Sequence, residues 1–262
     1  MFTTHAEMKS ARTSLQTQGA VARITLRNPP LNVIDIAMMD ELSEVLSEIE
    51  LRPDISVIVF SGEGKTFSAG VDVAAHTPDK VHEMLAKFHV VIRSLISTSK
   101  ITIAAVHGHC LGGGAELAMV CDMVYTTESA QWGFPEIKLG CYPPVACASL
   151  SAVVGPKRAA ELILTGRTID GTEVAQVGLA TRAVPEKELA ATVNDSVGRL
   201  SALSSAALAI TKKASYAWDA IHFDKALARA EKIYLDELIK TEDAREGIRA
   251  FLEKREPKWS GK

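Results

Sequence analysis

The sequence predicts an α/β fold in which strands alternate with helices and an all-helical segment follows. Short apolar runs rich in β-branched residues, such as 55–60 and 101–106, have the pattern of buried parallel strands. Segments between them, such as 36–50, carry apolar residues at three- and four-residue spacing, which is typical of amphipathic helices. Beyond Pro185 the helical spacing continues. We therefore expect a catalytic core over residues 1–200 and a helical region over 201–262.

Length, composition and charge restrict the function classes. The chain has 262 residues, 47% of them hydrophobic, which is enough for one large core. It lacks the run of about 18 apolar residues that a membrane helix needs, and its first 18 residues are polar, so we expect a cytoplasmic protein with no membrane span. The net charge of −3 gives no broad basic surface, which argues against nucleic acid as a partner.

The cysteines and histidines do not predict a metal site. Cys110, Cys121, Cys141 and Cys147 show no Cys-x-x-Cys spacing, so we expect free thiols instead of disulfides or a structural zinc. His107 and His109 flank Gly108, but nothing nearby completes a ligand set. His82 and His89 lie seven residues apart on an expected helix, and we expect both at the surface.

The first half of the chain contains strand–helix units. We expect a strand over 21–26 that ends before Pro29-Pro30, followed by the helix 36–50 with Asp35 as its N-cap. The strand 55–60, a turn over 61–65 and a helix over 78–96 come next, and the strand 101–106 then leads to three consecutive glycines.

The second half is more helical. We expect a strand over 120–125 and a helix over 156–166, which has a proline near its start and a glycine at its end. Asp170 is expected to cap the next short helix, and a strand over 179–184 follows. The clearest helices beyond it are 203–218, 223–240 and 243–254.

The chemical signal is a glycine turn followed by two acidic residues. Gly112, Gly113 and Gly114 stand where a helix should begin after a strand, and uncovered amides at such a position attract negative charge. Glu116 follows two residues later, and Glu136 lies among apolar and turn-forming neighbours. Two carboxyl groups beside an anion-attracting backbone predict acid/base chemistry on an activated carbonyl.

Each feature also has a simpler structural interpretation. The glycines could form only a tight strand-to-helix junction, and Glu116 could merely stabilise the positive end of its own helix. Glu136 could pair with Lys138 or with a distant arginine. The presence of the two glutamates together favours the catalytic interpretation.

Four segments in order resemble the crotonase (enoyl-CoA hydratase/isomerase) superfamily. They are Phe67-Ser68-Ala69-Gly70-Val71-Asp72, Gly112-Gly113-Gly114-Ala115-Glu116, Trp132-Gly133-Phe134-Pro135-Glu136 and the stretch 246–255. The resemblance implies a crotonase-like spiral of ββα units with a C-terminal helical trimerisation region at 201–262, assembled as a homotrimer or homohexamer. It also implies an acyl-CoA thioester as substrate and no separate cofactor.

The resemblance assigns roles to individual residues. It implies that the amides of Ala69 and Gly113 form the oxyanion hole, and that Glu116 and Glu136 are the two catalytic glutamates. Hydration of a double bond conjugated to a thioester puts charge on the carbonyl oxygen, which two N–H donors stabilise. We expect Glu116 to activate water and Glu136 to deliver the proton; the reverse division remains open, because coupled carboxyl groups share their titration.

Further residues are expected to bind the substrate. The resemblance places pantetheine and adenine along the backbone from Lys65 to Asp72, although Asp72 could be only a helix cap. It brings Phe251 and Lys254 to the adenosine or phosphates bound by a neighbouring subunit. Trp132 and Tyr142 are candidates for the wall of the acyl pocket, with core packing as the alternative.

One segment departs from the pattern of common straight-chain hydratases, which have a glycine-rich turn after the second glutamate. Here Tyr142-Pro143-Pro144-Val145-Ala146 stands instead, and the prolines should stiffen this wall. The segment is similar to that of hydratases acting on cyclohexa-1,5-diene-1-carbonyl-CoA in anaerobic degradation of aromatic acids such as benzoate. The expected product is 6-hydroxycyclohex-1-ene-1-carbonyl-CoA.

Several alternatives stay open at this point. Within the same fold, the chain could be a generic hydratase of linear enoyl-CoA esters, an enoyl-CoA isomerase, or a hydrolase that opens a cyclic acyl-CoA. From another class, it could be a non-catalytic scaffold or an RNA-binding member of the fold, although the net charge of −3 counts against RNA.

Overall fold

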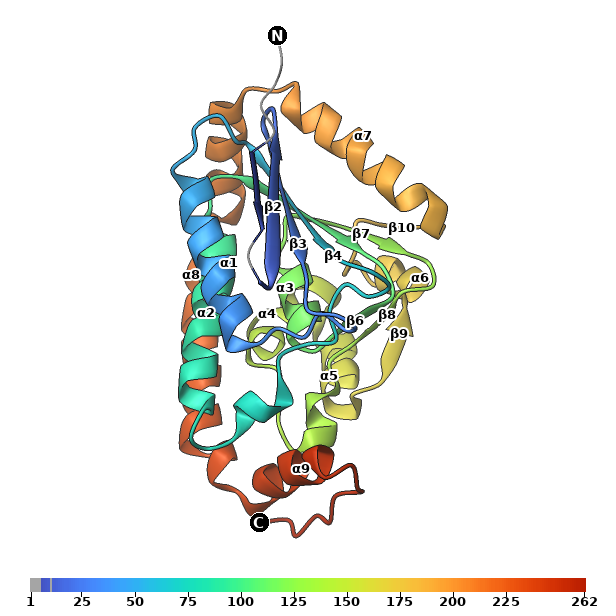
Figure 1. Cartoon of the computed structure of the whole chain (residues 1–262). Coiled ribbons are helices and arrows are strands. Elements are labelled where there is room, and N and C mark those ends of the chain that lie inside the picture. Colours follow the sequence, from blue (N-terminus) through green and yellow to red (C-terminus); the bar gives the residue numbers. More distant parts are fainter. Residues whose placement is uncertain (1–5, 10) are drawn as a thin grey trace.

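A computed structural model describes residues 6–9 and 11–262 of the protein (Figure 1). The main sheet has seven strands in the order β1-β2-β3-β4-β5-β7-β10. Strands β1 to β3 pair antiparallel, and the strands from β3 to β10 pair parallel. The bounds are β1 Ala6–Lys9, β2 Thr13–Gln18, β3 Val21–Leu26, β4 Val57–Gly62, β5 Ile101–Val106, β7 Met123–Thr127 and β10 Arg182–Val184.

A second, three-stranded sheet and a series of helices complete the fold. The small sheet has the order β6-β8-β9, with β6 His109–Leu111, β8 Gln131–Gly133 and β9 Thr168–Asp170. The α-helices are α1 Ile36–Glu50, α2 Val81–Ser97, α3 Gly113–Met119, α4 Pro144–Val154, α5 Pro156–Thr165, α6 Gly171–Gln176, α7 Leu189–Ser201, α8 Ser205–Asp236 and α9 Glu242–Leu252. The 3₁₀ helices are η1 Val73–His76, η2 Pro135–Leu139, η3 Glu186–Glu188 and η4 Leu238–Lys240.

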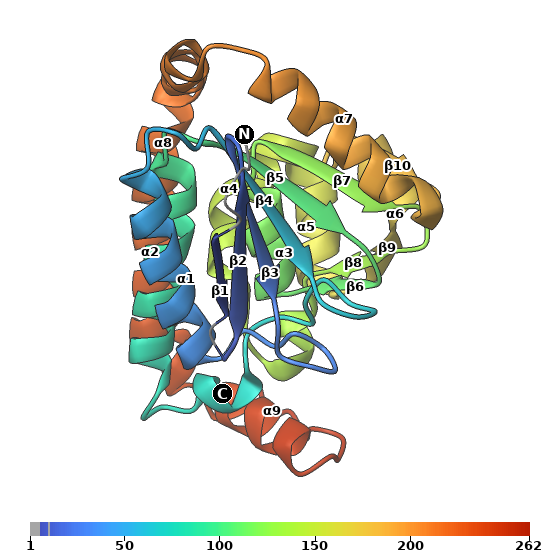
Figure 2. The same cartoon turned by 45° about the horizontal axis from the view of Figure 1, so that its top comes forward.

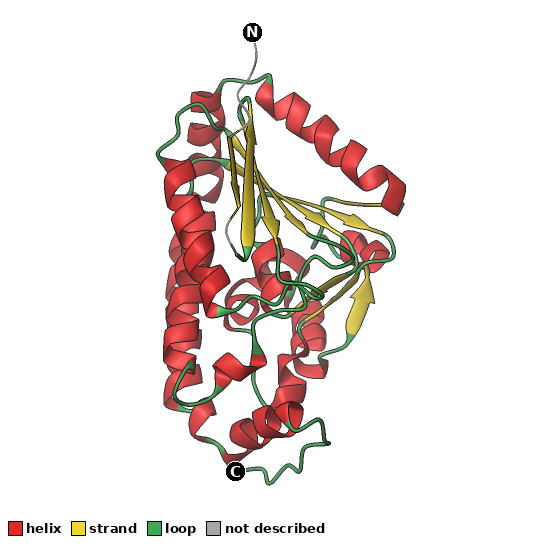
Figure 3. Cartoon of the chain, in the orientation of Figure 1, coloured by secondary structure: helices red, strands yellow, loops and turns green. Residues whose placement is uncertain are grey.

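Helices cover both faces of the main sheet (Figures 2 and 3). On one face, α7 packs its apolar residues against side chains of the parallel strands, such as Val57 and Ile103. On the other face, the larger core joins the sheet to α1, α2 and α3. Burial on both faces explains why the parallel strands are almost continuously apolar.

Most predicted elements agree with the structure to within a few residues. The side chain of Asp35 accepts a hydrogen bond from the Met38 amide, and that of Asp170 accepts one from the Glu173 amide, so both predicted N-caps are confirmed. Gly166 ends α5 in the left-handed conformation. The alternation of strands and helices, and the helical C-terminal region, are confirmed as well.

The predicted break in the C-terminal region is wrong. Residues 203–218 and 223–240 were expected as separate helices, but α8 runs without interruption from Ser205 to Asp236. No proline or glycine occurs within it, so nothing in the chain breaks the helix. Figure 1 shows α8 running alongside α2, and α9 lying at the end of α8 remote from α7.

The packing of α8 also corrects the prediction for His89. His89 is 0% exposed, and its Nδ1 lies 2.7 Å from Oε2 of Glu231 on α8. The residue points toward α8 instead of solvent, because the long helix covers this side of α2. His82 is exposed as expected.

One backbone pairing brings the two glycine-containing motifs together. The amides of Phe67 and Ser68 donate to the carbonyls of His107 and His109 at 2.9 and 3.0 Å, and Leu111 N–H donates back to Ser68 at 3.0 Å. The segment after β4 therefore runs parallel to the segment after β5. This pairing holds residues 69–72 directly against the start of α3.

Candidate active site

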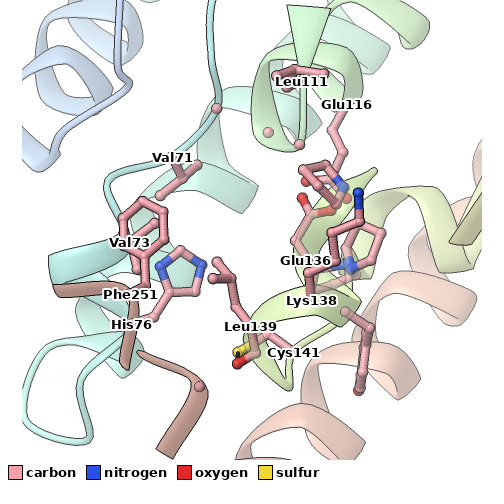
Figure 4. A pocket seen from close by; sticks show the side chains of 18 of the residues that line it. Val71, Val73, His76, Leu111, Glu116, Glu136, Lys138, Leu139, Cys141 and Phe251 are labelled. Carbon is pink, nitrogen blue, oxygen red and sulfur yellow. Dashed lines mark hydrogen bonds between the residues drawn. The ribbon is translucent and has the colours of Figure 1, made fainter. Parts of the chain in front are cut away.

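A cavity of about 420 Å³ opens where η1, α2, the start of α3, η2 and α9 meet. Its size falls within the range of small-molecule sites. Its wall is largely apolar, with a few polar groups that Figure 4 shows pointing inward. The residues used below are Ala69, Val71, His76, Phe88, Gly112, Gly113, Glu116, Glu136, Lys138, Cys141, Tyr142, Pro143, Tyr234, Phe251 and Arg255.

Glu116 lies in the first turn of α3 and is 3% exposed. Its Oε1 accepts a hydrogen bond of 2.9 Å from the amide of Ala146, at the start of α4. Burial raises the pKa of Glu116 to about 7, while the amides of Ala146 and Val145 favour the ionised form and oppose the rise. Glu116 is therefore a carboxyl group that exchanges its proton near neutral pH.

Glu136 follows Pro135 in the first turn of η2. Burial raises the pKa of Glu136 well above its usual range, and the negative charge of Glu116 raises it further. Its Oε2 is buried and has no hydrogen-bond partner in the described part of the chain. Figure 4 shows the two glutamates on the same side of the pocket, opposite Val71, Val73 and His76. Glu136 thus favours the protonated form when Glu116 is ionised.

Gly112 leaves the space that Glu136 occupies. A Cβ atom at Gly112 would lie 2.7 Å from Oε1 of Glu136, and the residue has φ +50°. The positive φ therefore favours glycine, and a side chain here would displace the carboxyl group of Glu136.

The backbone amides near the glutamates differ in whether they are free to donate a hydrogen bond to a bound molecule. Ala69 N–H already donates to the carbonyl of Leu31 at 2.9 Å, so the prediction for Ala69 requires correction. Residues 70–72 pair with Ile34 through Gly70 and Asp72, which turns the intervening Val71 amide to the opposite side. The Val71 amide makes no hydrogen bond within the described residues, and a Cβ at Gly113 would lie 3.4 Å from its nitrogen. Gly113 is the first residue of α3, where amides have no partner within the helix.

The chain is similar to a family of known proteins. Residues 16–262 match the family described as enoyl-CoA hydratase/isomerase. The chain belongs to this family. A cyclohexa-1,5-dienecarbonyl-CoA hydratase of Thauera aromatica is 33% identical over 250 residues, covering 95% of this chain and 96% of that protein. A probable enoyl-CoA hydratase of Bacillus subtilis is 35% identical over 254 residues, covering 95% and 98%.

Solved structures of the family show the same fold. A crystal structure of an enoyl-CoA hydratase from Mycobacterium avium subsp. paratuberculosis superimposes with a TM-score of 0.87 at 26% identity, covering 96% of this chain and all of that chain. An enoyl-CoA hydratase/isomerase from Xanthobacter autotrophicus gives 0.85 at 30% identity, with coverage of 94% and 98%. The predicted crotonase-like fold and the enzyme class, a hydro-lyase of the enoyl-CoA hydratase type, are confirmed.

The other predicted substrate-binding residues divide into two groups. Tyr142, Pro143 and Phe251 line the pocket of the chain that carries them. The contact of Phe251 with a neighbouring subunit stays a prediction. Trp132 is 1% exposed and lies outside the pocket, where its Nε1 donates to Oγ1 of Thr126 at 3.0 Å. Trp132 therefore belongs to the core, as the alternative interpretation held.

The remaining predicted residues are not part of the pocket wall either. Lys65 is exposed in the turn after β4, and Lys254 is exposed just after α9. The side chain of Asp72 accepts a hydrogen bond of 3.0 Å from the Ala74 amide and caps η1. Asp72 thus has the capping role that was weighed for it.

The structure adds polar residues that sequence reasoning missed. His76 lines the pocket with its Nδ1 3.0 Å from the Asp72 carbonyl oxygen, and burial lowers its pKa, so the imidazole is neutral at pH 7. Lys138 and Arg255 also lie in the pocket wall. Phe88 and Tyr234 also line the pocket, and nothing in the sequence indicated Tyr234, because its position depends on how α8 packs.

The described residues contain no group of three or more metal-ligating side chains close enough to hold an ion. All four cysteines are free thiols, as expected, and Cys141 lies in the pocket wall. Within the described residues, none of the helices is long and apolar enough to cross a membrane.

Proposed function

We propose that this protein adds water to a conjugated double bond of a coenzyme A thioester. The observation that carries the proposal is the pair of buried glutamates, whose pKa values are both raised, beside the unpaired Val71 amide and the start of α3. Two carboxyl groups in such different environments can act as base and acid in one reaction.

In the proposed reaction, ionised Glu116 takes a proton from water while the water oxygen forms a bond to the β-carbon. The electrons of the double bond move onto the thioester oxygen, where the amides of Val71 and Gly113 stabilise the negative charge. Protonated Glu136 then delivers its proton to carbon. The assignment follows from the hydrogen bonds to Glu116, which favour its ionised form, and from their absence at Oε2 of Glu136 within the described residues.

We further propose that the acyl group is a flat ring, with cyclohexa-1,5-diene-1-carbonyl-CoA as substrate and 6-hydroxycyclohex-1-ene-1-carbonyl-CoA as product. The aromatic rings of Phe88, Tyr142 and Tyr234 lie in the pocket wall. Pro143 and Pro144 begin α4 and fix the adjacent backbone. The Thauera aromatica relative, whose name states this activity, supports the same choice.

Two cationic side chains are suited to the phosphates of coenzyme A. Lys138 and Arg255 lie in the pocket wall, and Arg255 is held by Glu246, whose Oε1 lies 2.5 Å from its Nη1. We propose that these residues take the phosphate-binding role that was predicted for Lys254.

A panel of linear, branched and cyclic enoyl-CoA esters tests the proposal, with mass detection of the product gaining one water. We expect the cyclic dienoyl ester to give the highest kcat/KM. Glu116→Gln and Glu136→Gln should each lower kcat by roughly 10²–10⁴-fold, because each removes a proton-transfer group. Full activity of both variants would contradict the mechanism.

The panel also separates the second candidate, a hydratase of linear substrates. That candidate is favoured by relatives named simply enoyl-CoA hydratase, including the Bacillus subtilis protein. A higher kcat/KM for a linear ester than for any cyclic ester would decide for it. Reaction in ¹⁸O-labelled water separates both from an isomerase, which leaves solvent oxygen out of the product.

A further inference from the structure

Tyr234 on α8 is a buried pocket residue that the proposed mechanism does not use. Its side chain is 2% exposed, and it lines the same cavity as Glu136. Its hydroxyl has no nitrogen or oxygen hydrogen-bond partner in the described part of the chain, and its polar neighbour is the thiol of Cys141, a weak hydrogen-bonding group. A buried hydroxyl in this state costs stability unless a bound molecule satisfies it.

The neighbouring Tyr142 provides a contrast. Its hydroxyl donates to the carbonyl of Ala230 at 2.7 Å, one helical turn before Tyr234. The two rings pack edge to face with their centres 5.1 Å apart at an interplanar angle of 68°. This packing fixes the Tyr234 ring. The two tyrosines share one wall, and among the described residues only the Tyr142 hydroxyl donates to a backbone carbonyl.

The chemistry of the substrate limits what the free hydroxyl can bind. The proposed acyl groups contain only carbon and hydrogen apart from the thioester oxygen, which the Val71 and Gly113 amides receive. The remaining oxygen is the one that the reaction adds. Oε2 of Glu136, the group assigned to proton delivery, is also buried without a partner among the described residues and faces the same cavity.

Tyr234 stays a neutral hydrogen-bond donor in this position. Burial raises its pKa well above the ordinary value, and the neighbouring Cys141 and the charge of Glu136 act in the same direction. The hydroxyl is therefore suited to donating a hydrogen bond and not to losing its proton.

We propose that the hydroxyl of Tyr234 binds the added oxygen: the attacking water during hydration, and the β-hydroxyl of the hydroxyacyl thioester in the reverse direction. This inference rests on the proposed function and adds a third polar group to the two glutamates. It also identifies β-hydroxyacyl thioesters as ligands that the pocket distinguishes from their unhydroxylated counterparts.

Tyr234→Phe removes only the hydroxyl and keeps the ring that packs on Tyr142. The probes are cyclohexanecarbonyl-CoA and 2-hydroxycyclohexanecarbonyl-CoA, with Kd measured by titration calorimetry in a Glu116→Gln background to prevent turnover. We expect Tyr234→Phe to weaken binding of the hydroxylated ester by about tenfold, and that of the plain ester by less than about twofold. Tyr142→Phe, the matched control, should change both Kd values by the same factor.

Equal changes for the two esters in Tyr234→Phe, or no change in either, would overturn the proposal. Because the measurement is one of binding, it remains decisive even if the protein hydrates none of the esters in the panel. If the protein hydrates none of the esters, the proposed function fails, but the binding measurement still tests whether Tyr234 binds a hydroxyl group.

Discussion

At the scale of single residues, the site depends on carboxyl groups that are kept out of water. Glu116 is buried but receives amide hydrogen bonds from the start of α4, whereas Oε2 of Glu136 receives none from the described residues. The two side chains therefore differ in acidity although they face one cavity. Sequence patterns identified both glutamates, because carboxylates are unusual among such apolar neighbours.

The pH dependence of kcat/KM follows from this difference. Loss of the proton from Glu116 should raise activity as pH increases through about 7, and loss of the proton from Glu136 should lower it at higher pH. Initial rates with the best thioester, measured in steps across this range, should give a bell-shaped curve. Its rising and falling limbs report the two apparent pKa values of the coupled pair Glu116 and Glu136.

The residual activity of Glu116→Gln provides the control, since glutamine does not titrate and the limb near pH 7 should disappear. A wild-type profile that is flat from about pH 5 to 9 would contradict the assignment of these roles.

The sequence could not show which backbone amide faces the pocket. Successive amides in an extended segment point to opposite sides, and the pairing of residues 70–72 with Ile34 decides that Val71, and not Ala69, is available. Similarly, Tyr234 and His89 acquire their neighbours only through the packing of α8.

At the scale of elements, local rules predicted those with strong patterns and caps. The helix α1 and strand β5 are examples, because their apolar spacing is regular. Strand β2 was missed because its buried residues include the polar Thr13, Ser14 and Thr17. A buried strand is normally predicted from apolar residues. Helix α4 was missed because Pro143 and Pro144 were interpreted as a stiff pocket wall, whereas Pro144 occupies the first turn of a helix, where proline is tolerated.

The junction between β6 and α3 supports a prediction about Gly112. Gly112→Ala should lower kcat by roughly 100-fold, because the new methyl group would displace the Glu136 carboxyl group. Gly19→Ala is the matched control: Gly19 also has a positive φ, +56°, and a Cβ added there would meet no atom within 4 Å, so the variant places alanine at a positive φ without the clash.

Both alanine variants should lose about 1 kcal/mol of unfolding free energy in a denaturant titration, while only Gly112→Ala should lose activity. Comparable kcat values for the two would show that Glu136 does not depend on the space left at Gly112.

At the scale of the whole molecule, the C-terminal region contributes to its own chain. The helix α8 contacts α2 and α4, and α9 contacts η1 and η2, which places Phe251 and Arg255 in the pocket wall. The division into a core over 1–200 and a helical region over 201–262 remains a prediction, as does the role of that region in assembly.

We expect a homotrimer or homohexamer. Exposed apolar side chains on and near α8, including Leu203 and Ile210, are 59% and 69% exposed and are suited to a subunit contact. Light scattering coupled to size-exclusion chromatography should give three or six times the 28.1 kDa mass of the chain. A mass equal to one chain at micromolar concentration would contradict the expected assembly. Ile210→Glu places a charge on the exposed apolar surface of α8 and should lower the measured mass if this surface forms the subunit contact.

The position of α9 determines how an assembly would work. Each chain supplies both glutamates and both candidate amides, and its own α9 contributes to the pocket wall. Mixing Glu116→Gln subunits with Glu136→Gln subunits would therefore restore no turnover, and hybrids with intact copies would work in simple proportion to the intact fraction. Association is therefore not required to bring the two glutamates together, because one chain supplies both.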